Sequence, residues 1–288
     1  MGSDKKVPLC QSPMKDCSSK EGRANNVGDD RCTKHAIEGR YGKVFCAEHQ
    51  NAVGSPESGW EPEYTPSVLN ALYKYVKTHN CMSYALRGNF MNAGLILQCA
   101  SDNDCESVNF EQPGGKSGRR NAMRNEGLRT CPVVQKLVEA DVGKIDFKPA
   151  TFCSKCPDGY SKVALVVHNG TDYHWYRQDK GGLWSHKDGS NPVKNFDASN
   201  QKIFNPQNCD RDYGKDLNYK QFCGFFCVNR EEVPNLGQGG SRRGNKRKTR
   251  RWSLFGGSSG SSRTYRSRSR GSSGSSGSSR NSRRAINI

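Results

Sequence analysis

Apolar residues are concentrated in one part of this 288-residue chain, and that part limits any folded core. Hydrophobic residues make up only 33% of the sequence, well below the share of a typical globular protein. Nearly all the apolar periodicity and most of the aromatic residues lie between Val68 and Val228. We therefore predict a small module over residues 1–55, a folded core over residues 60–229 and a C-terminal tail over residues 230–288.

The predicted tail carries most of the net charge of +17. From Arg242 to Ile288 there are 14 Lys or Arg and no Asp or Glu, which leaves 17 − 14 = +3 for residues 1–241. A segment of Gly, Ser and Arg buries too little apolar surface to offset its conformational entropy, so we predict that the tail is disordered. Its basic clusters indicate binding of nucleic acid or another polyanion through residues 242–288, and residues 242–251 also match a nuclear-import signal. The alternative is a tail that only keeps the protein in solution.

The chain has 13 cysteines, which is many for a cytosolic protein and an odd number for a disulfide scaffold. The N-terminus lacks the apolar stretch of a secretory signal. No apolar run approaches the roughly 18–20 residues that cross a bilayer. We therefore expect an intracellular, non-secreted protein of the nucleus or a virion, with reduced thiols and no membrane partner. Metal binding then explains paired cysteines better than disulfides do.

Two Cys-x-x-His pairs in the first segment, at residues 32–35 and 46–49, have the spacing of zinc ligands. The segment has hardly any apolar core, so a metal would supply its folding energy. The preferred ligands of one structural Zn²⁺ are Cys17, Cys32, Cys46 and His49, with Cys10 and His35 as substitutes. The candidates for a second zinc site are Cys153, Cys156, Cys223 and Cys227. The alternative for these four is core packing, and strand alternation would point Cys223 and Cys227 to the same face.

The core starts with helical patterns and continues with strand patterns. Residues 66–76 predict an amphipathic helix capped by Ser67, a second helix begins at Cys81, and residues 131–140 predict a third. The predicted strands cover residues 162–167, 173–178 and 221–228, and Asn169-Gly170 marks a hairpin turn between the first two. Helices followed by a meandering antiparallel sheet predict the α+β class.

Cys81 is the candidate nucleophile, because a thiol at a helix N-terminus is favoured as the thiolate. The alternative is a buried cysteine that only packs. His174 or His186 would act as the base, with Asp188 or Asp197 as the orienting carboxylate. The backbone N–H of Cys81 and a nearby donor such as Asn80 would hold the oxyanion.

The pairing of the second hairpin decides which of these histidines faces the Cys81 helix. A four-residue turn at residues 179–182 would pair Trp175 with His186 and Arg177 with Trp184. That register places Trp175, Arg177, Trp184 and His186 on one face of the sheet and His174, Tyr176 and Ser185 on the other. A shift of one residue would regroup them all.

The sequence Cys81-Met-Ser-Tyr84-Ala85 resembles the Cys-x-x-Tyr-Ala signature of CHAP amidase/peptidase domains. The resemblance implies a papain-like fold and a cysteine hydrolase that cleaves an amide or isopeptide bond of a protein or peptide. In that family the base is a histidine at the start of the first sheet strand. Here that position is Lys162, which is a departure from the pattern.

The Cys81 stretch, together with residues 174–178, 182–189 and 222–227, also resembles an uncharacterised domain of large DNA viruses and some bacteria. The pattern from Cys17 to His49 is similar to the Cys₃His zinc modules of viral proteins. We therefore expect a papain-like cysteine hydrolase tethered to nucleic acid by its tail. The alternatives are a catalytically inactive papain-like binding module and a viral structural or DNA-packaging protein.

Overall fold

The computed structural model describes residues 8–12, 17, 32–39, 41–88, 91–101, 104–105, 109–214 and 216–231. Residues 1–241 form one compact unit, and residues 242–288 are divided from it. The predicted basic tail lies, apart from its first two residues, outside the described residues. All the helices and strands among the described residues belong to the first unit.

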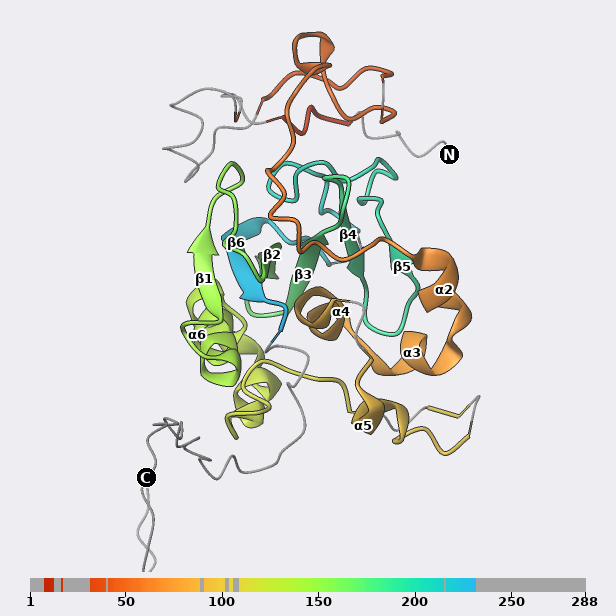
Figure 1. The fold of residues 1–288 in the computed structure, drawn as a ribbon, viewed down its shortest axis with the longest axis vertical. Coiled ribbons are helices and arrows are strands. Elements are labelled where there is room, and N and C mark those ends of the chain that lie inside the picture. Colours follow the sequence, from red (N-terminus) through yellow and green to blue (C-terminus); the bar gives the residue numbers. More distant parts are fainter. Residues whose placement is uncertain are drawn as a thin grey trace, which may run out of the picture. The chain divides into compact units, whose positions relative to one another are not determined.

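Among the described residues, all the helical elements precede all the strands along the chain (Figure 1). The helical elements are η1 (Ala47–His49), α2 (Pro66–Ala71), α3 (Tyr73–Thr78), α4 (Cys81–Arg87), α5 (Ala93–Ile96), η2 (Arg120–Arg124), η3 (Glu126–Leu128) and α6 (Cys131–Val142). The strands are β1 (Phe147–Ala150), β2 (Tyr160–His168), β3 (Asp172–Gln178), β4 (Trp184–Lys187), β5 (Val193–Lys194) and β6 (Gln221–Asn229). Every helix among the described residues is too short or too polar to cross a lipid bilayer.

The six strands form one sheet in the order β1-β6-β2-β3-β4-β5, and all neighbours are antiparallel. The predicted α+β class is therefore confirmed. The last strand, β6, enters between β1 and β2, so β2 is central. The eight residues from Tyr160 to Val167 are all buried, as expected of a strand covered on both faces.

The two faces of the sheet pack against different parts of the chain. Helices α4 and α6 contact one face, and Figure 1 shows α4 against β3 and α6 beside β1. On that face Leu165 and Trp175 belong to a core cluster that also contains Cys81. On the other face Val166 and Trp184 pack with residues of the N-terminal segment such as Phe45. The N-terminal segment is thus part of the core packing.

The first predicted helix is divided in two. Leu72 has an extended backbone, with φ −91° and ψ 90°, and separates α2 from α3. Val68 and Leu72 are exposed, so the apolar stripe that predicted one continuous helix is not buried along its whole length. Ser67 is not the cap, because the N-cap residue of α2 is Thr65. The predicted helix over residues 131–140 is confirmed as α6, with Val134, Leu137 and Val138 buried.

The predicted register of the second hairpin is wrong by one residue. Tyr176 pairs with His186, and Gln178 pairs with Trp184. The cause is the turn, in which the backbone N–H of Asp179 donates to the Leu183 carbonyl over 2.9 Å. The loop between them is one residue shorter than expected, and its two glycines, at 181 and 182, both have positive φ.

This correction regroups the side chains of β3 and β4. His174, Tyr176, Trp184 and His186 share one face, because alternate residues of a strand point to the same side and Tyr176 lies opposite His186. The opposite face carries Trp175, Arg177 and Ser185, and it is the face that α4 covers. The Tyr84 hydroxyl of α4 is 2.6 Å from the Ser185 hydroxyl.

Four disulfides cross-link the unit, which makes the expectation of reduced thiols wrong. They join Cys17 to Cys153, Cys99 to Cys105, Cys131 to Cys223, and Cys156 to Cys227. The remaining cysteines are Cys10, Cys32, Cys46, Cys81 and Cys209, and all five are buried. Three of the four disulfides span more than 70 residues of sequence, so they link segments that lie far apart in the chain.

Candidate functional site

Cys81 is the first residue of α4, and the helix start is fixed by its N-cap residue Asn80. The backbone N–H of Ser83 donates to Asn80 Oδ1 over 3.0 Å. The Asn80 side-chain amide donates to the Glu111 carbonyl over 2.7 Å. The helix start that the sequence predicts at Cys81 is therefore confirmed, and it is anchored to the loop that carries Glu111.

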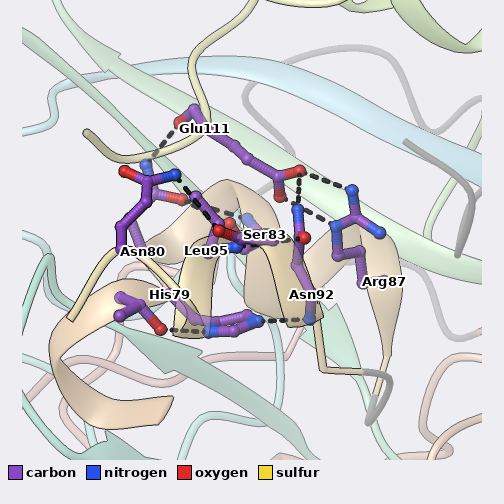
Figure 2. A network of polar contacts seen from close by, with 10 residues as sticks. His79, Asn80, Ser83, Arg87, Asn92, Leu95 and Glu111 are labelled. Carbon is purple, nitrogen blue, oxygen red and sulfur yellow. Dashed lines mark hydrogen bonds and ion pairs between the residues drawn. The ribbon is translucent and has the colours of Figure 1, made fainter. Parts of the chain in front are cut away.

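The residues around this helix start form a polar network (Figure 2). Glu111 also accepts a hydrogen bond from Arg87 Nε over 2.8 Å. His79 is closer in sequence to Cys81 than any other histidine, and its Nε2 accepts the Asn92 backbone N–H over 2.8 Å. Its Nδ1 therefore carries the proton and lies 2.8 Å from the Thr78 hydroxyl.

Both ring nitrogens of His79 are thus occupied, and its ring stacks on Tyr75 with 4.4 Å between the centroids. Burial lowers the pKa of His79 to about 3, so the ring is neutral at physiological pH. His79 holds the α3–α5 region together and does not serve as a base for Cys81. The sequence does not reveal this role, because a lone histidine before a helix has no spacing that identifies its partners.

The Cys81 side chain is 6% exposed. Burial raises the pKa of its thiol well above the ordinary value, and the negative charge of Asp172 adds to this. A hydrogen bond from the backbone of Trp175 acts in the opposite direction without reversing the shift. The thiol is therefore protonated at neutral pH, despite its position at the helix N-terminus.

The two histidines predicted as bases lie on the sheet face opposite to α4 and bond to each other. His174 Nε2 is 2.8 Å from His186 Nδ1. Asp188 Oδ1 lies 3.0 Å from His186 Nδ1 and 3.4 Å from His174 Nε2. The structure thus brings three of the predicted catalytic residues together. Among the described residues, the hydrogen bonds of these two imidazoles go to one another, to Asp188 and to Phe196, and Cys81 is not among their partners.

Asp197 does not join this group. Its carboxylate accepts the backbone N–H groups of Ser199, Gln201 and Asp210 over 2.9–3.0 Å, which makes it an organiser of its own loop. Burial raises its pKa to about 6 even though these hydrogen bonds oppose the shift.

Lys162, which stands where CHAP domains have their catalytic histidine, makes structural hydrogen bonds instead. Its ammonium group donates to the Phe152 carbonyl over 3.0 Å and to the Ser55 hydroxyl. Burial lowers its pKa to about 7. The side chain therefore fastens the loop before β2 and the segment around Ser55 to the central strand.

A cleft of about 560 Å³ is lined by residues from both sides of the sheet end. Cys81 reaches it from the start of α4, His174 from β3 and Asp188 from the loop after β4. Tyr213 and Tyr219 add aromatic surface to the same cleft. Three of the predicted catalytic residues, Cys81, His174 and Asp188, thus border one cleft. No hydrogen bond joins Cys81 to either imidazole among the described residues.

The N-terminal segment gathers a Cys/His group that can hold a metal ion. It consists of Cys10, Cys32, Cys46 and His49, whose ligand atoms all lie within 4.8 Å of one another. The Cys46 sulfur is 3.2 Å from His49 Nδ1 and 3.8 Å from the Cys32 sulfur. The Cys10 sulfur is 3.5 Å from His49 Nδ1.

Two ligand assignments of this site need correction. Cys17 is not a ligand, because its sulfur is bonded to Cys153, and the substitute Cys10 takes its place. His35 is exposed and stands outside the group; its backbone forms a β-bridge with Leu9. A disulfide partner more than a hundred residues away leaves no trace in local spacing, which is why the sequence could not separate Cys10 from Cys17.

The predicted second zinc site is wrong. Its four cysteines belong to three different disulfides. Cys223 and Cys227 do not share a face either, because the pairing of β6 with β2 shifts between Leu165 and Val166. This β-bulge turns Cys223 toward α6, where it meets Cys131. Cys227 stays with the opposite cluster around Cys156.

Fold and sites together define a disulfide-bonded α+β protein with a Cys/His group suited to a metal ion. The chain is 33% identical over 121 residues to insoluble matrix shell protein 1 of Ruditapes philippinarum, and the match covers 41% of this chain and 70% of that protein. The chain belongs to the same family as that shell protein. No described domain family and no solved structure matches it.

Proposed function

We propose that this chain is a secreted structural protein of an extracellular matrix, and that its core is a cross-linked scaffold instead of a hydrolase. The observation that carries the proposal is the set of four disulfides. Disulfides form and persist in oxidising environments and are rare in the cytosol. Kinship with a protein named for an insoluble shell matrix supports the same location and role.

The chemistry around Cys81 supports a scaffold. A cysteine nucleophile needs a lowered pKa and a base within hydrogen-bond reach. Cys81 has a raised pKa because it is buried, and His174 and His186 are bonded to each other on the opposite face of the sheet. Cys81 belongs to the core cluster that also holds Leu165 and Trp175, which gives it a packing role.

We further propose that the Cys/His group holds one structural Zn²⁺. Bond lengths of about 2.3 Å for Zn–S and 2.0–2.1 Å for Zn–N place two sulfurs of a tetrahedron about 3.8 Å apart and a sulfur and a nitrogen about 3.6 Å apart. The separations in the group are 3.8 Å between Cys32 and Cys46 and 3.2–3.5 Å from the two sulfurs to His49. Four protein ligands close the coordination sphere, as in structural zinc sites.

Fractionation of the tissue that makes the protein tests the proposed location. Insoluble extracellular material and cell lysate would be separated, and each would be probed with an antibody against residues 60–231. A cytosolic marker protein controls for leakage. We expect the protein in the insoluble extracellular fraction. Recovery only from the lysate would overturn the proposal.

The second candidate function is the cysteine hydrolase predicted from the sequence, acting on an amide or isopeptide bond. One observation favours it: Cys81, His174 and Asp188 border the same cleft. Movement of a loop at that cleft would have to bring the thiol and an imidazole together before any reaction.

Thiol labelling separates the two candidates. The native full-length protein would be treated with iodoacetamide at pH 6, and the modification of each cysteine would be followed by mass spectrometry. Cys209 is the matched control, because it is also buried and outside the four disulfides. The scaffold proposal predicts that Cys81 reacts no faster than Cys209. Labelling of Cys81 at least ten times faster would support the hydrolase.

A further inference from the structure

The group of His174, His186 and Asp188 has no role in the proposed scaffold, and its contacts point to a ligand. All three side chains direct one polar atom to a common point, so that Nε2, Nδ1 and Oδ1 lie 2.8–3.4 Å from one another. His174 and His186 are almost completely buried, and Asp188 is half-buried at the cleft. We propose that these residues bind a divalent transition-metal ion.

His186 carries a proton on the ring nitrogen that faces away from Asp188. Its Nε2 lies 2.9 Å from the Phe196 carbonyl oxygen, which can only accept a hydrogen bond. Nε2 therefore carries a hydrogen, which leaves Nδ1 as the ring atom that can offer a lone pair to a metal ion. That lone pair faces the Asp188 carboxylate oxygen at 3.0 Å.

Nε2 of His174, Nδ1 of His186 and Oδ1 of Asp188 lie close enough together to be ligands of one metal ion. A metal ion at the common point would accept a lone pair from each of the three. Metal-ligating histidines commonly donate their other ring N–H to a backbone carbonyl, as His186 does to Phe196.

The separations fit neighbouring ligands of one ion. With bonds of about 2.1 Å, ligands at right angles lie about 3.0 Å apart, and tetrahedral ligands lie about 3.4 Å apart. The three observed separations are 2.8, 3.0 and 3.4 Å. Two imidazoles and one carboxylate on one side of an ion leave its remaining positions open, and this donor set selects zinc, iron and related ions over calcium or magnesium.

The surroundings hold this geometry in place. His174 and His186 stand on the paired strands β3 and β4, opposite Val166 and Tyr176 respectively. Lys194 Nζ binds the second oxygen of Asp188 over 2.6 Å, which leaves the first oxygen aimed at the imidazoles. The open positions of the ion would face the cleft, because His174 and Asp188 line it. A small ligand in the cleft could therefore reach the ion.

Zinc counting tests this site together with matched variants. The full chain, with its disulfides formed and its metals removed by a chelator, would be saturated with Zn²⁺ alone and passed through gel filtration. Bound zinc would then be measured by elemental mass spectrometry. We expect about two ions per wild-type chain and about one in Asp188→Asn, with at least a tenfold weaker Kd at the altered site.

Two control variants assign the ions. Cys46→Ser removes a ligand of the N-terminal group and should also leave about one ion. Asp172→Asn changes another carboxylate of the same cleft and should keep both. One ion in the wild type that Cys46→Ser abolishes, or two ions in Asp188→Asn, would overturn the proposal.

A measurement on the wild type protects the test against a variant that fails to fold. Nitrogen-15 spectra of the histidine rings would be recorded before and after addition of Zn²⁺. We expect the His186 Nδ1 and His174 Nε2 resonances to move while His186 Nε2 stays protonated. Unchanged resonances of both rings at saturating zinc would refute the site.

Discussion

Removal of the Cys131–Cys223 disulfide should lower the free energy of unfolding more than removal of the short Cys99–Cys105 disulfide does. This bond joins α6 to β6 and spans 92 residues of sequence. The Cys156–Cys227 disulfide remains in the variant and already shortens the path between Cys131 and Cys223. In the unfolded wild type, the Cys131–Cys223 bond therefore closes a loop of only about 30 residues, which runs from Cys131 to Cys156, across the other disulfide to Cys227, and back to Cys223. The loop-entropy relation then gives a loss of about 3.6 kcal/mol for Cys131→Ala with Cys223→Ala.

The short disulfide Cys99–Cys105 supplies the matched control, because its two residues are 6 apart. The same relation gives a loss of about 2.2 kcal/mol when both are changed to alanine. Urea unfolding of the two double variants and the wild type, followed by tryptophan fluorescence without reductant, yields the three free energies. Trp175 lies in the core cluster that Cys131 and Cys223 adjoin, so it reports on this region.

If loop closure sets the stabilisation, removal of the long-range disulfide lowers the free energy of unfolding more than removal of the short one. Equal losses in the two double variants, or a loss below about 1 kcal/mol for the Cys131–Cys223 pair, would contradict the loop-closure argument. Either result would mean that the folded contacts of α6 with β6, and not the cross-link, set the stability of this region.

Three further predictions concern acid stability, the metal group and the tail. Burial lowers the pKa of His79 from 6.5 to about 3, so the unfolded chain binds the proton first and stability is lost as pH falls below 6.5. The share of His79 in the loss between pH 7 and pH 5 should be about 2 kcal/mol. Urea titrations of His79→Gln should show a loss smaller by that amount, and an undiminished loss would contradict the assignment to His79. Cys46→Ser should abolish zinc binding by the N-terminal group and lower the melting temperature, whereas the control His35→Ala, at an exposed residue nearby, should do neither. A Cys46→Ser protein that is as stable as the wild type in the presence of zinc would rule out a structural ion. We also propose that residues 242–288 bind nucleic acid or another polyanion. Their deletion should leave the melting temperature unchanged and remove most of the affinity for DNA, and the DNA affinity of the full chain should fall steeply with salt. Tight DNA binding by the truncated protein would place the binding site in residues 1–241.

Periodicity and turn chemistry were sufficient to predict most of the regular elements. The apolar run over residues 162–167, the Asn169-Gly170 turn and the helical spacing over residues 131–140 all correspond to elements of the structure. These signals are local, because burial of one helix face or of a whole strand shows in the pattern of consecutive residues. The helix start at Cys81 was likewise visible, because a polar stretch ending at Asn80 gives way there to an apolar helical pattern.

Long-range pairings were not predictable in the same way. Disulfide connectivity cannot be deduced from spacing alone, and the Cys17–Cys153 bond alone excluded a preferred zinc ligand. The hairpin register depended on whether Asp179 closes the turn with Leu183, and one residue of difference moved His186 to the other face. The raised pKa of Cys81 comes from burial by the folded chain, which opposes the effect of the helix start.

Disulfide mapping of the protein isolated from insoluble extracellular material, with free thiols blocked at extraction and no reductant, tests the central claim most directly. We predict linked peptides for Cys17–Cys153, Cys99–Cys105, Cys131–Cys223 and Cys156–Cys227. Cys10, Cys32, Cys46, Cys81 and Cys209 should be recovered as blocked thiols. Recovery of all 13 cysteines as blocked thiols would contradict the account of a secreted, cross-linked matrix protein.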